Sequence, residues 1–332
     1  MDWNQLNNEG FSGTVHVSRC GKELYSKGFG YAQRAERTLN RASTRFSIAS
    51  GSKIFTAVAI CQLVESGKLT FETRLTEYLD IPFPHFDEEI TLHHLLTHTA
   101  MVPDYFNEEV MDDFAELWEQ VPMYHVRRPK DFLPLFQHEP MQGKPGSTFA
   151  YNNSGYVLLG LVIEQASDIP FTDYVEKHVF TPAGMTRSGY FEADDLPSEV
   201  ATGYVEQPDG RFTSNIFSLP AKGGPDGGAY VTAGDIALFW EALLDGKLLS
   251  ARMTETLMTP HVQVDDDVFY GYGGYMVVAD GRAQTMIQMG YDPGVNYRAT
   301  FTPSNRQTIV VCSNHSEGAY EMLKEIEAML EK

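Results

Sequence analysis

One segment constrains the fold of this chain more than any other: Ile54–Val64 is apolar on nearly every side of the helix that it predicts. A helix without a polar face belongs in the interior of a protein. The run is bounded by Lys53 and Glu65 and is about half the ~20 residues that a membrane span needs. We therefore expect a buried core helix, with Ser50 and Lys53 at its start, and no membrane span.

Short apolar runs separated by turn residues lie at both ends of the chain. Residues 13–17 and 23–31 flank the turn Arg19–Lys22, and their β-branched content is typical of a hairpin. Near the other end the expected strands are 275–278, 284–289, 297–301 and 308–312, followed by a helix over 318–330. The middle of the chain instead predicts helices, over 54–66, 92–98, 156–166 and 233–244.

This distribution predicts an α+β fold, in which an antiparallel sheet formed from both chain ends is flanked by helices. A mainly helical domain is inserted between the two sheet-forming parts. We expect residues 1–80 and 205–332 to form the sheet domain and residues 81–204 the helical domain. The active site would lie between them.

Composition excludes some partners. The 332 residues carry 45 acidic and 25 basic side chains, a formal charge of −20, which argues against nucleic acid and anionic lipid surfaces. Cys20, Cys61 and Cys312 form no CxxC pair, and residues 1–13 lack the features of a signal peptide. We expect a cytoplasmic protein; an exported protein whose leader has been removed is the alternative. The sequence leaves the oligomeric state open.

Ser50 and Lys53 are spaced i, i+3, so on a helix their side chains share a face. The positive end of a buried helix disfavours the ammonium form of lysine, and a neutral amine accepts a proton from a nearby hydroxyl. The alternative is a serine N-cap followed by a lysine that extends to solvent. An SxxK pair alone favours that alternative.

The residues around Ser50 and Lys53 instead favour a catalytic role for this pair. Phe46–Ala57 resembles the first motif of the penicillin-recognising serine hydrolases, in the branch of class C β-lactamases, Tyr-x-Asn D-alanyl-D-alanine carboxypeptidases and related esterases. Further similar segments follow in family order over nearly the whole chain: 63–69, 90–99, 151–156, 182–185 and 227–235. The resemblance implies a serine hydrolase that acts through an acyl-enzyme, with Ser50 as nucleophile and no metal or organic cofactor.

The second motif of that family is matched by Tyr151-Asn152-Asn153. The resemblance implies that Tyr151 shuttles protons with Lys53, and that Asn153 orients Lys53 and binds a substrate amide. Asn153 or Ser154 is also expected to cap a helix. Class A enzymes differ, because they have a Ser-x-Asn motif and a glutamate-activated water.

The third motif departs from the family pattern. Gly290 and Gly294 keep its spacing, but Gln288 stands where the family has lysine or histidine. The backbone N–H groups of Ser50 and Tyr291 would hold the oxyanion. β-Lactams and D-Ala-D-Ala peptides present a carboxylate to the missing cation, so carboxylate recognition is weakened. Arg298 on the next strand is the candidate replacement.

The sequence therefore predicts a serine hydrolase acting on a small-molecule or peptide amide, β-lactam or ester, with neutral esters or amides favoured. The alternatives are a penicillin- or peptide-binding homologue that deacylates slowly, an esterase with little β-lactamase activity, and a family fold without catalysis. His93, His94 and His98 are assigned to packing or the surface rather than to a metal. The Gly-rich stretch 223–228 is interpreted as a loop at the cleft edge. Most aromatic residues between Phe83 and Phe136 are expected in the core, and a minority in an acyl pocket.

Overall fold

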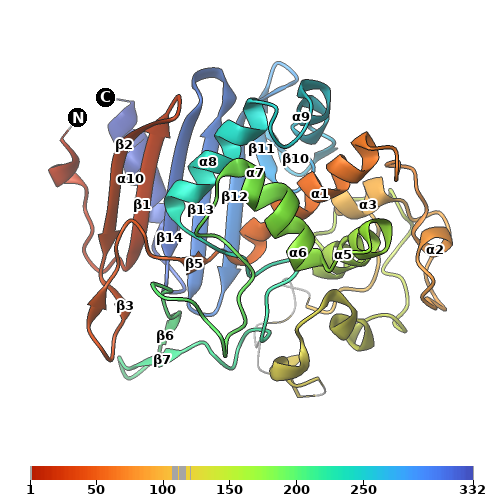
Figure 1. Cartoon of the computed structure of the whole chain (residues 1–332), viewed down its shortest axis with the longest axis horizontal. Helices are drawn as coiled ribbons and strands as arrows, with labels where there is room; N and C mark the ends of the chain where they lie inside the picture. Colours follow the sequence, from red (N-terminus) through yellow and green to blue (C-terminus); the bar gives the residue numbers. More distant parts are fainter. Residues whose placement is uncertain (1, 107–110, 112–116, 120, 332) are drawn as a thin grey trace.

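The computed structural model describes residues 2–106, 111, 117–119 and 121–331. Its central feature is an 8-stranded antiparallel sheet built from both ends of the chain (Figure 1). The strands follow one another in the order β2 (Lys22–Phe29), β1 (Gly13–Arg19), β14 (Gln307–Ser313), β13 (Val295–Thr302), β12 (Arg282–Asp292), β11 (Tyr275–Ala279), β10 (Val268–Tyr270) and β9 (Val262–Gln263). Strand β1 pairs with β14, which joins the two ends of the chain. The predicted fold class is confirmed.

Two tight turns connect neighbouring strands as the sequence predicts. Cys20 and Gly21 both have positive φ between β1 and β2, and Asp280 and Gly281 do so between β11 and β12. Turns with two successive left-handed residues match the right-handed twist of the strands that they join. Strands β9 and β10 were not predicted, because segments of two and three residues carry too little periodicity to be recognised.

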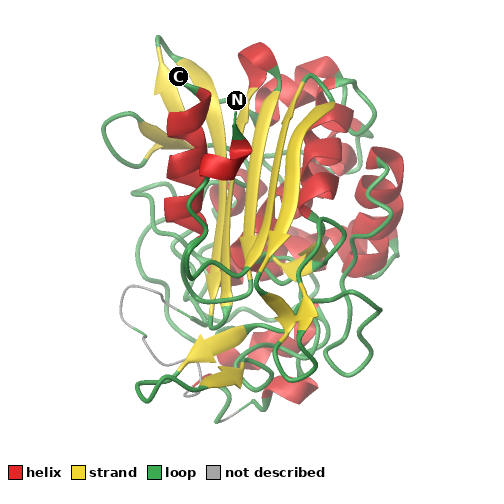
Figure 2. Cartoon of the chain, turned by 90° about the vertical axis from the view of Figure 1, so that its left-hand side faces the viewer, coloured by secondary structure: helices red, strands yellow, loops and turns green. Residues whose placement is uncertain are grey.

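The sheet is covered on both faces. Helix α10 (Ala319–Leu330) packs on β13 and β14, while α8 (Ala233–Leu244) packs against β1 and β14 from the other side (Figure 2). Successive strand residues point to opposite faces. In β14, Ile309 and Val311 accordingly join the cluster with α10, and Val310 and Cys312 join the main core.

Helix α1 (Lys53–Glu65) lies inside the main core, where it packs against α5 (Asn153–Ser167) and α9 (Ala251–Leu257). Every residue from Lys53 to Cys61 is buried, as expected for a helix without a polar face. A short 3₁₀ turn, η2 (Ala49–Ser52), leads directly into it. The main core therefore surrounds the point where the Ser-Lys pair begins.

The remaining elements are short. Among the described residues, the other helices are η1 (Trp3–Gln5), α2 (Leu75–Tyr78), α3 (Leu92–Leu96), η3 (Met123–His125), η4 (Pro129–Leu135), α6 (Phe171–Val175), η5 (Glu176–Phe180), α7 (Thr181–Ala183) and η6 (Pro303–Asn305). Three two-stranded sheets pair β3 (Tyr31–Gln33) with β4 (Thr38–Leu39), β5 (Phe46–Ser47) with β8 (Tyr230–Val231), and β6 (Tyr204–Glu206) with β7 (Phe212–Ser214). Within the described ranges, no helix has both the length and the apolar character to cross a bilayer.

Candidate active site

Ser50 and Lys53 meet at the junction between η2 and α1. Ser50 belongs to η2, and Lys53 is the first residue of α1. Lys53 is only 1% exposed, and its Nζ lies 3.0 Å from Ser50 Oγ. The alternative in which the lysine extends to solvent is therefore wrong.

The backbone before Ser50 is held in an unusual conformation by its neighbours. Ala49 has a φ of 44°, a left-handed value that costs a residue with a side chain about 1–3 kcal/mol. Ser52 stabilises the turn, because its hydroxyl donates to Ala49 O (2.8 Å) and accepts from Ala229 N (3.0 Å). Ser52 is thus engaged with backbone, whereas the Ser50 hydroxyl faces Lys53.

Two glycines allow the sheet to approach this turn. A Cβ on Gly51 would lie 2.5 Å from the Tyr297 ring, and one on Gly290 would lie 2.1 Å from Ile48 O. Real Cβ atoms do not tolerate such distances. Strand β12 therefore lies against η2, with Gly290 beside the backbone of this turn.

The Lys53 ammonium nitrogen lies among oxygen acceptors from different parts of the chain. Besides Ser50 Oγ, its Nζ donates to Asn153 Oδ1 (2.8 Å) and to the backbone oxygen of Asp226 (2.6 Å). An ammonium group has three N–H bonds with which to donate to such acceptors. For Lys53 to accept the Ser50 proton, it must act as the neutral amine and turn a lone pair toward that hydroxyl.

Asn153 reaches Lys53 because α5 begins at this residue, three positions before the predicted start. Its neighbour Asn152 caps the helix, accepting from Gly155 N at 2.7 Å. The expectation that Asn153 or Ser154 would be the cap is therefore wrong. Capping by Asn152 leaves the Asn153 side chain available for Lys53.

A buried carboxyl group adds to this helix start. Asp104 Oδ1 accepts from the backbone N–H groups of Asn153 (3.0 Å) and Ser154 (2.9 Å). Burial raises the pKa of Asp104 to about 7, although these hydrogen bonds oppose the shift. Asp104 was not predicted from the sequence, because it lies 49 residues before Asn153 and no local pattern links the two.

Tyr151 lies next to Lys53, and the lysine nitrogen faces the aromatic ring of Tyr151. Lys53 Nζ is 4.9 Å from the centre of the Tyr151 ring, and the His98 ring is 4.3 Å from it on centroids. His98 is buried; its Nδ1 accepts from Asn152 N (3.0 Å), so its Nε2 carries the hydrogen that faces Tyr270 Oη (3.0 Å). Burial, followed by the charge of Lys53, holds the pKa of His98 well below its ordinary value.

The other two histidines of that segment also have local partners. His93 Nδ1 lies 2.9 Å from Tyr272 Oη, and His94 Nδ1 accepts from Thr91 N in a capping box at the start of α3. Across the part of the chain that the structure describes, no group of three His, Cys, Asp or Glu side chains could hold a metal ion. The packing assigned to these histidines accounts for their contacts.

The side chains of the third motif and of the neighbouring strand β13 point in different directions. Gln288 is 3% exposed and its Oε1 accepts from Tyr297 Oη at 2.9 Å, so this amide is directed into the core. Tyr291 is half exposed. Arg298 lies over the Tyr320 ring of α10, 5.3 Å from its centre, which is the opposite face of the sheet. The suggestion that Arg298 replaces the missing cation is wrong.

A cavity of about 480 Å³ lies beside Ser50. Its apolar wall includes four aromatic residues from the segment in which an acyl pocket was anticipated: Tyr105, Phe106, Trp118 and Phe132. Phe83, Phe86 and Phe136 pack elsewhere in the core, and Phe114 lies outside the described residues. The Gly-rich loop also lines the cavity, in agreement with its interpretation as a cleft edge.

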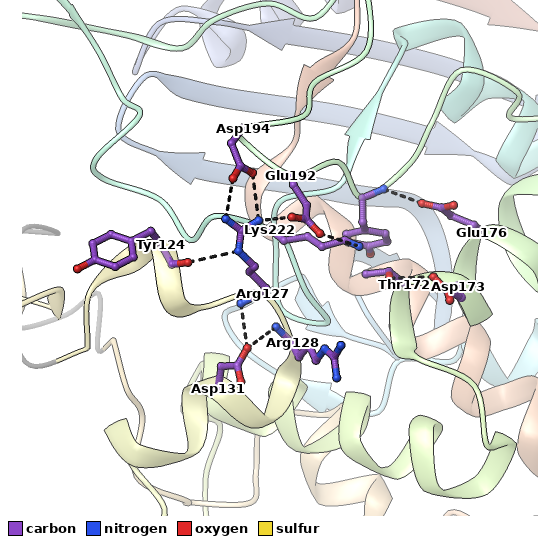
Figure 3. Close-up of polar contacts among 11 residues, drawn as sticks. Tyr124, Arg127, Arg128, Asp131, Thr172, Asp173, Glu176, Glu192, Asp194 and Lys222 are labelled. Carbon is purple, nitrogen blue, oxygen red and sulfur yellow. Dashed lines mark hydrogen bonds and ion pairs between the residues drawn. The ribbon is translucent and has the colours of Figure 1, made fainter.

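An ion-pair network supports one wall of this cavity. Arg127 pairs with Glu192 and Asp194, and Lys222 lies 3.9 Å from Glu192 (Figure 3). The backbone adds to it, because Ala193 N donates to Ala221 O at 2.7 Å. Ala193 and Ala221 both line the cavity, so the network fixes the wall from behind.

A Ser-x-x-Lys pair at the start of a core helix, an asparagine bonded to that lysine, and a sheet strand pressed against the serine define a class: serine hydrolases that act through an acyl-enzyme. The comparisons agree. The sequence model of the Beta-lactamase family matches residues 6–331, and the chain belongs to that family. It is a serine hydrolase of the β-lactamase-like, penicillin-binding-protein group.

Three similar proteins illustrate the relationship. A penicillin-binding protein of Bacillus halodurans, solved by crystallography, is 52% identical, with a TM-score of 0.92 over 96% of this chain and 97% of that one. The putative penicillin-binding protein PbpX of Bacillus subtilis is 32% identical over 95% of this chain and 74% of its own length. The octameric penicillin-binding protein homologue of Pyrococcus abyssi is 26% identical, with a TM-score of 0.86 over 100% of this chain and 78% of that one.

Proposed function

We propose that Ser50 is the nucleophile of this hydrolase and that Lys53 and Tyr151 transfer the protons. Ser50 Oγ attacks the substrate carbonyl and gives its proton to Lys53, and Tyr151 assists in passing a proton to the leaving amine or alcohol. Water then cleaves the resulting ester and regenerates Ser50. The observation that carries the proposal is the 3.0 Å contact between Lys53 Nζ and Ser50 Oγ beside the cavity.

The remaining roles follow from position. Asn153 orients Lys53 through its Oδ1 and is placed to bind a substrate amide. The backbone N–H groups of Ser50 and Tyr291 would hold the oxyanion, an arrangement supported by the close approach of β12 to η2 at Gly290. We further propose that the site lies between a sheet domain of residues 1–80 and 205–332 and a helical domain of residues 81–204.

The preferred substrates are amides or esters that do not depend on a carboxylate. This choice rests on Gln288, whose amide is hydrogen-bonded to Tyr297 in the core rather than presented as a charge. The names of the relatives favour a second candidate, a penicillin-binding protein that acylates readily and deacylates slowly. An adduct on Ser50 that persists for hours supports this second candidate, and one that turns over within minutes supports the hydrolase.

The test is intact-mass detection of an adduct after reaction with a β-lactam and, in parallel, with a short-chain activated ester. We expect a single adduct that maps to Ser50 by peptide analysis. Replacing Ser50 with Ala should abolish it, whereas Ser52→Ala, the matched change two residues away, should still permit labelling. Undiminished labelling of Ser50→Ala would falsify the assignment of the nucleophile.

A further inference from the structure

The cavity beside Ser50 has an uneven distribution of charge. Two of its lining residues, Asp226 and Asp292, carry carboxyl groups, and none of its described lining residues is a lysine, arginine or histidine. The sequence between Phe106 and Leu117, described only at Met111, contains no basic residue either. Lys53 belongs to the reacting centre, and the space beyond Ser50 is bordered by the two acidic residues.

The two acidic lining residues come from different parts of the fold. Asp226 belongs to the Gly-rich loop and accepts a hydrogen bond from Tyr105 Oη. Asp292 ends β12, next to the turn that joins it to β13. Burial raises the pKa of Tyr105 well above its ordinary value, and the charges of Asp226 and Asp292 add to this shift. Both carboxyl groups therefore act on the same region of the cavity.

Three basic residues are adjacent in sequence to residues that line the cavity, but their side chains contact other groups. The Arg34 guanidinium lies 3.7 Å from the centre of the Phe212 ring. Arg45 donates to two backbone oxygens, those of Arg187 and Ser198, each at 2.6 Å. Lys222 lies beside Glu192 in the network behind the wall (Figure 3). None of these three residues is among those that line the cavity.

We propose that this cavity selects acyl groups that carry a protonated amine and discriminates against those that carry a carboxylate. The apolar surfaces of Trp118, Phe132 and Leu219 would contact the hydrocarbon part of the same acyl group. The substrate class is thus an amide or ester of an amine-bearing, apolar acyl group, for example a hydrophobic amino acid amide or ester with a free amino group. This inference rests on the proposed function, because it concerns the acyl group that Ser50 receives.

The acylation step needs no reactant besides the substrate, and water then cleaves the acyl-enzyme. Ser50 Oγ forms an ester bond with the substrate carbonyl as the bond to the leaving amine or alcohol breaks. The leaving group receives the proton that Ser50 released through Lys53. The protonated amine of the acyl group remains near Asp292 and Asp226 throughout and takes no part in bond exchange.

The test compares three aryl esters with the same hydrophobic acyl chain, one with a free ammonium group, one N-acetylated and one N-succinylated. They carry a positive charge, no charge and a negative charge, respectively, at pH 6.5. We expect kcat/KM to be at least tenfold higher for the ammonium ester than for the neutral ester, and lowest for the carboxylate ester. Asp292→Asn should reduce the ammonium-to-neutral ratio at least fivefold, and Asp226→Asn should reduce it as well.

The control is Asp280→Asn, which removes the same charge from an exposed turn at the other end of the β11–β12 hairpin. Its ammonium-to-neutral ratio should equal that of the wild type. Equal rates for the three esters, a preference for the carboxylate, or a ratio unchanged in both cavity variants would overturn the inference. Failure of the proposed function is distinguishable, because the neutral ester would then leave no adduct on Ser50.

Discussion

The two halves of the reaction centre are built differently. At the starts of α1 and α5, Lys53 connects Ser50 and Asn153 through hydrogen bonds of 3.0 and 2.8 Å. On β12, the side chain of Gln288 is instead buried against Tyr297. The helix starts present a polar network to the cleft, whereas the strand contributes its backbone through Gly290.

This difference separates bond chemistry from substrate recognition. Acylation needs a nucleophile, a base and an oxyanion site, all of which depend on the helix starts and on strand backbone. Carboxylate recognition needs a cation, and the third-motif position on β12 is the neutral Gln288. A family member can therefore retain the first while changing the second, and four variants test how far the two halves are independent.

The largest effect is expected for Lys53→Met, which removes the base but keeps an apolar chain of similar length. The rate of acylation by a neutral activated ester should fall by about 10²–10⁴-fold. Lys68→Met, an exposed lysine just after α1, is the matched control and should label at the wild-type rate. Stopped-flow release of the leaving group measures both; a decrease below tenfold in Lys53→Met would remove Lys53 from the proton path.

Asp104→Asn tests the helix-start half through pH. Because the pKa of Asp104 is raised to about 7, the folded state binds its proton more tightly than the unfolded state does. The wild type therefore loses stability as the pH rises from about 4 to about 7, by about 4 kcal/mol at most. Asn keeps an oxygen acceptor for the two backbone N–H groups but does not titrate.

Urea unfolding of Asp104→Asn at pH 5 and pH 8 should consequently show a smaller decrease in the free energy of unfolding than the wild type shows. Asp280→Asn serves as an exposed control and should keep the wild-type pH dependence. Identical pH dependence in wild type and Asp104→Asn would mean that Asp104 is ionised in the fold.

Gly290→Ala tests the contact between the two halves. The added methyl would lie 2.1 Å from Ile48 O, a backbone atom that cannot rotate aside, so the strand must move away from η2. We expect the free energy of unfolding to fall by about 1–3 kcal/mol and acylation to slow. Gly234→Ala in α8, where the nearest atom is 3.8 Å away, should be neutral or slightly stabilising. The midpoints of urea unfolding measure this difference. Equal midpoints for the two variants would show that β12 does not pack tightly against η2 at Gly290.

Gln288→Leu should have the smallest effect. It leaves the buried hydroxyl of Tyr297 without its acceptor, which costs about 1–2 kcal/mol. Adding Tyr297→Phe removes that hydroxyl and should restore most of the loss in thermal unfolding. Acylation by the neutral ester should change by less than tenfold in the single variant; a decrease as large as that of Lys53→Met would show that Gln288 belongs with the base.

Much of the site could be predicted because its residues are close in sequence or belong to family motifs. Ser50 and Lys53 lie within one helical turn, and Tyr151 and Asn153 form a short motif. The residues that were missed act over long separations. Asp104 meets Asn153 across 49 residues, and the backbone oxygen of Asp226 meets Lys53 across 173.

The sequence by itself determined the apolar core helix, the sheet-forming ends of the chain and the Ser-Lys pair, because each depends on local periodicity and spacing. Only the tertiary structure decided where side chains point. It directed Gln288 and Arg298 away from the cleft and brought Asp226 and Asp292 to the same cavity. The direction of a side chain depends on which elements pack against it. Charged residues that are distant in sequence become neighbours only when the sheet and the helices pack together.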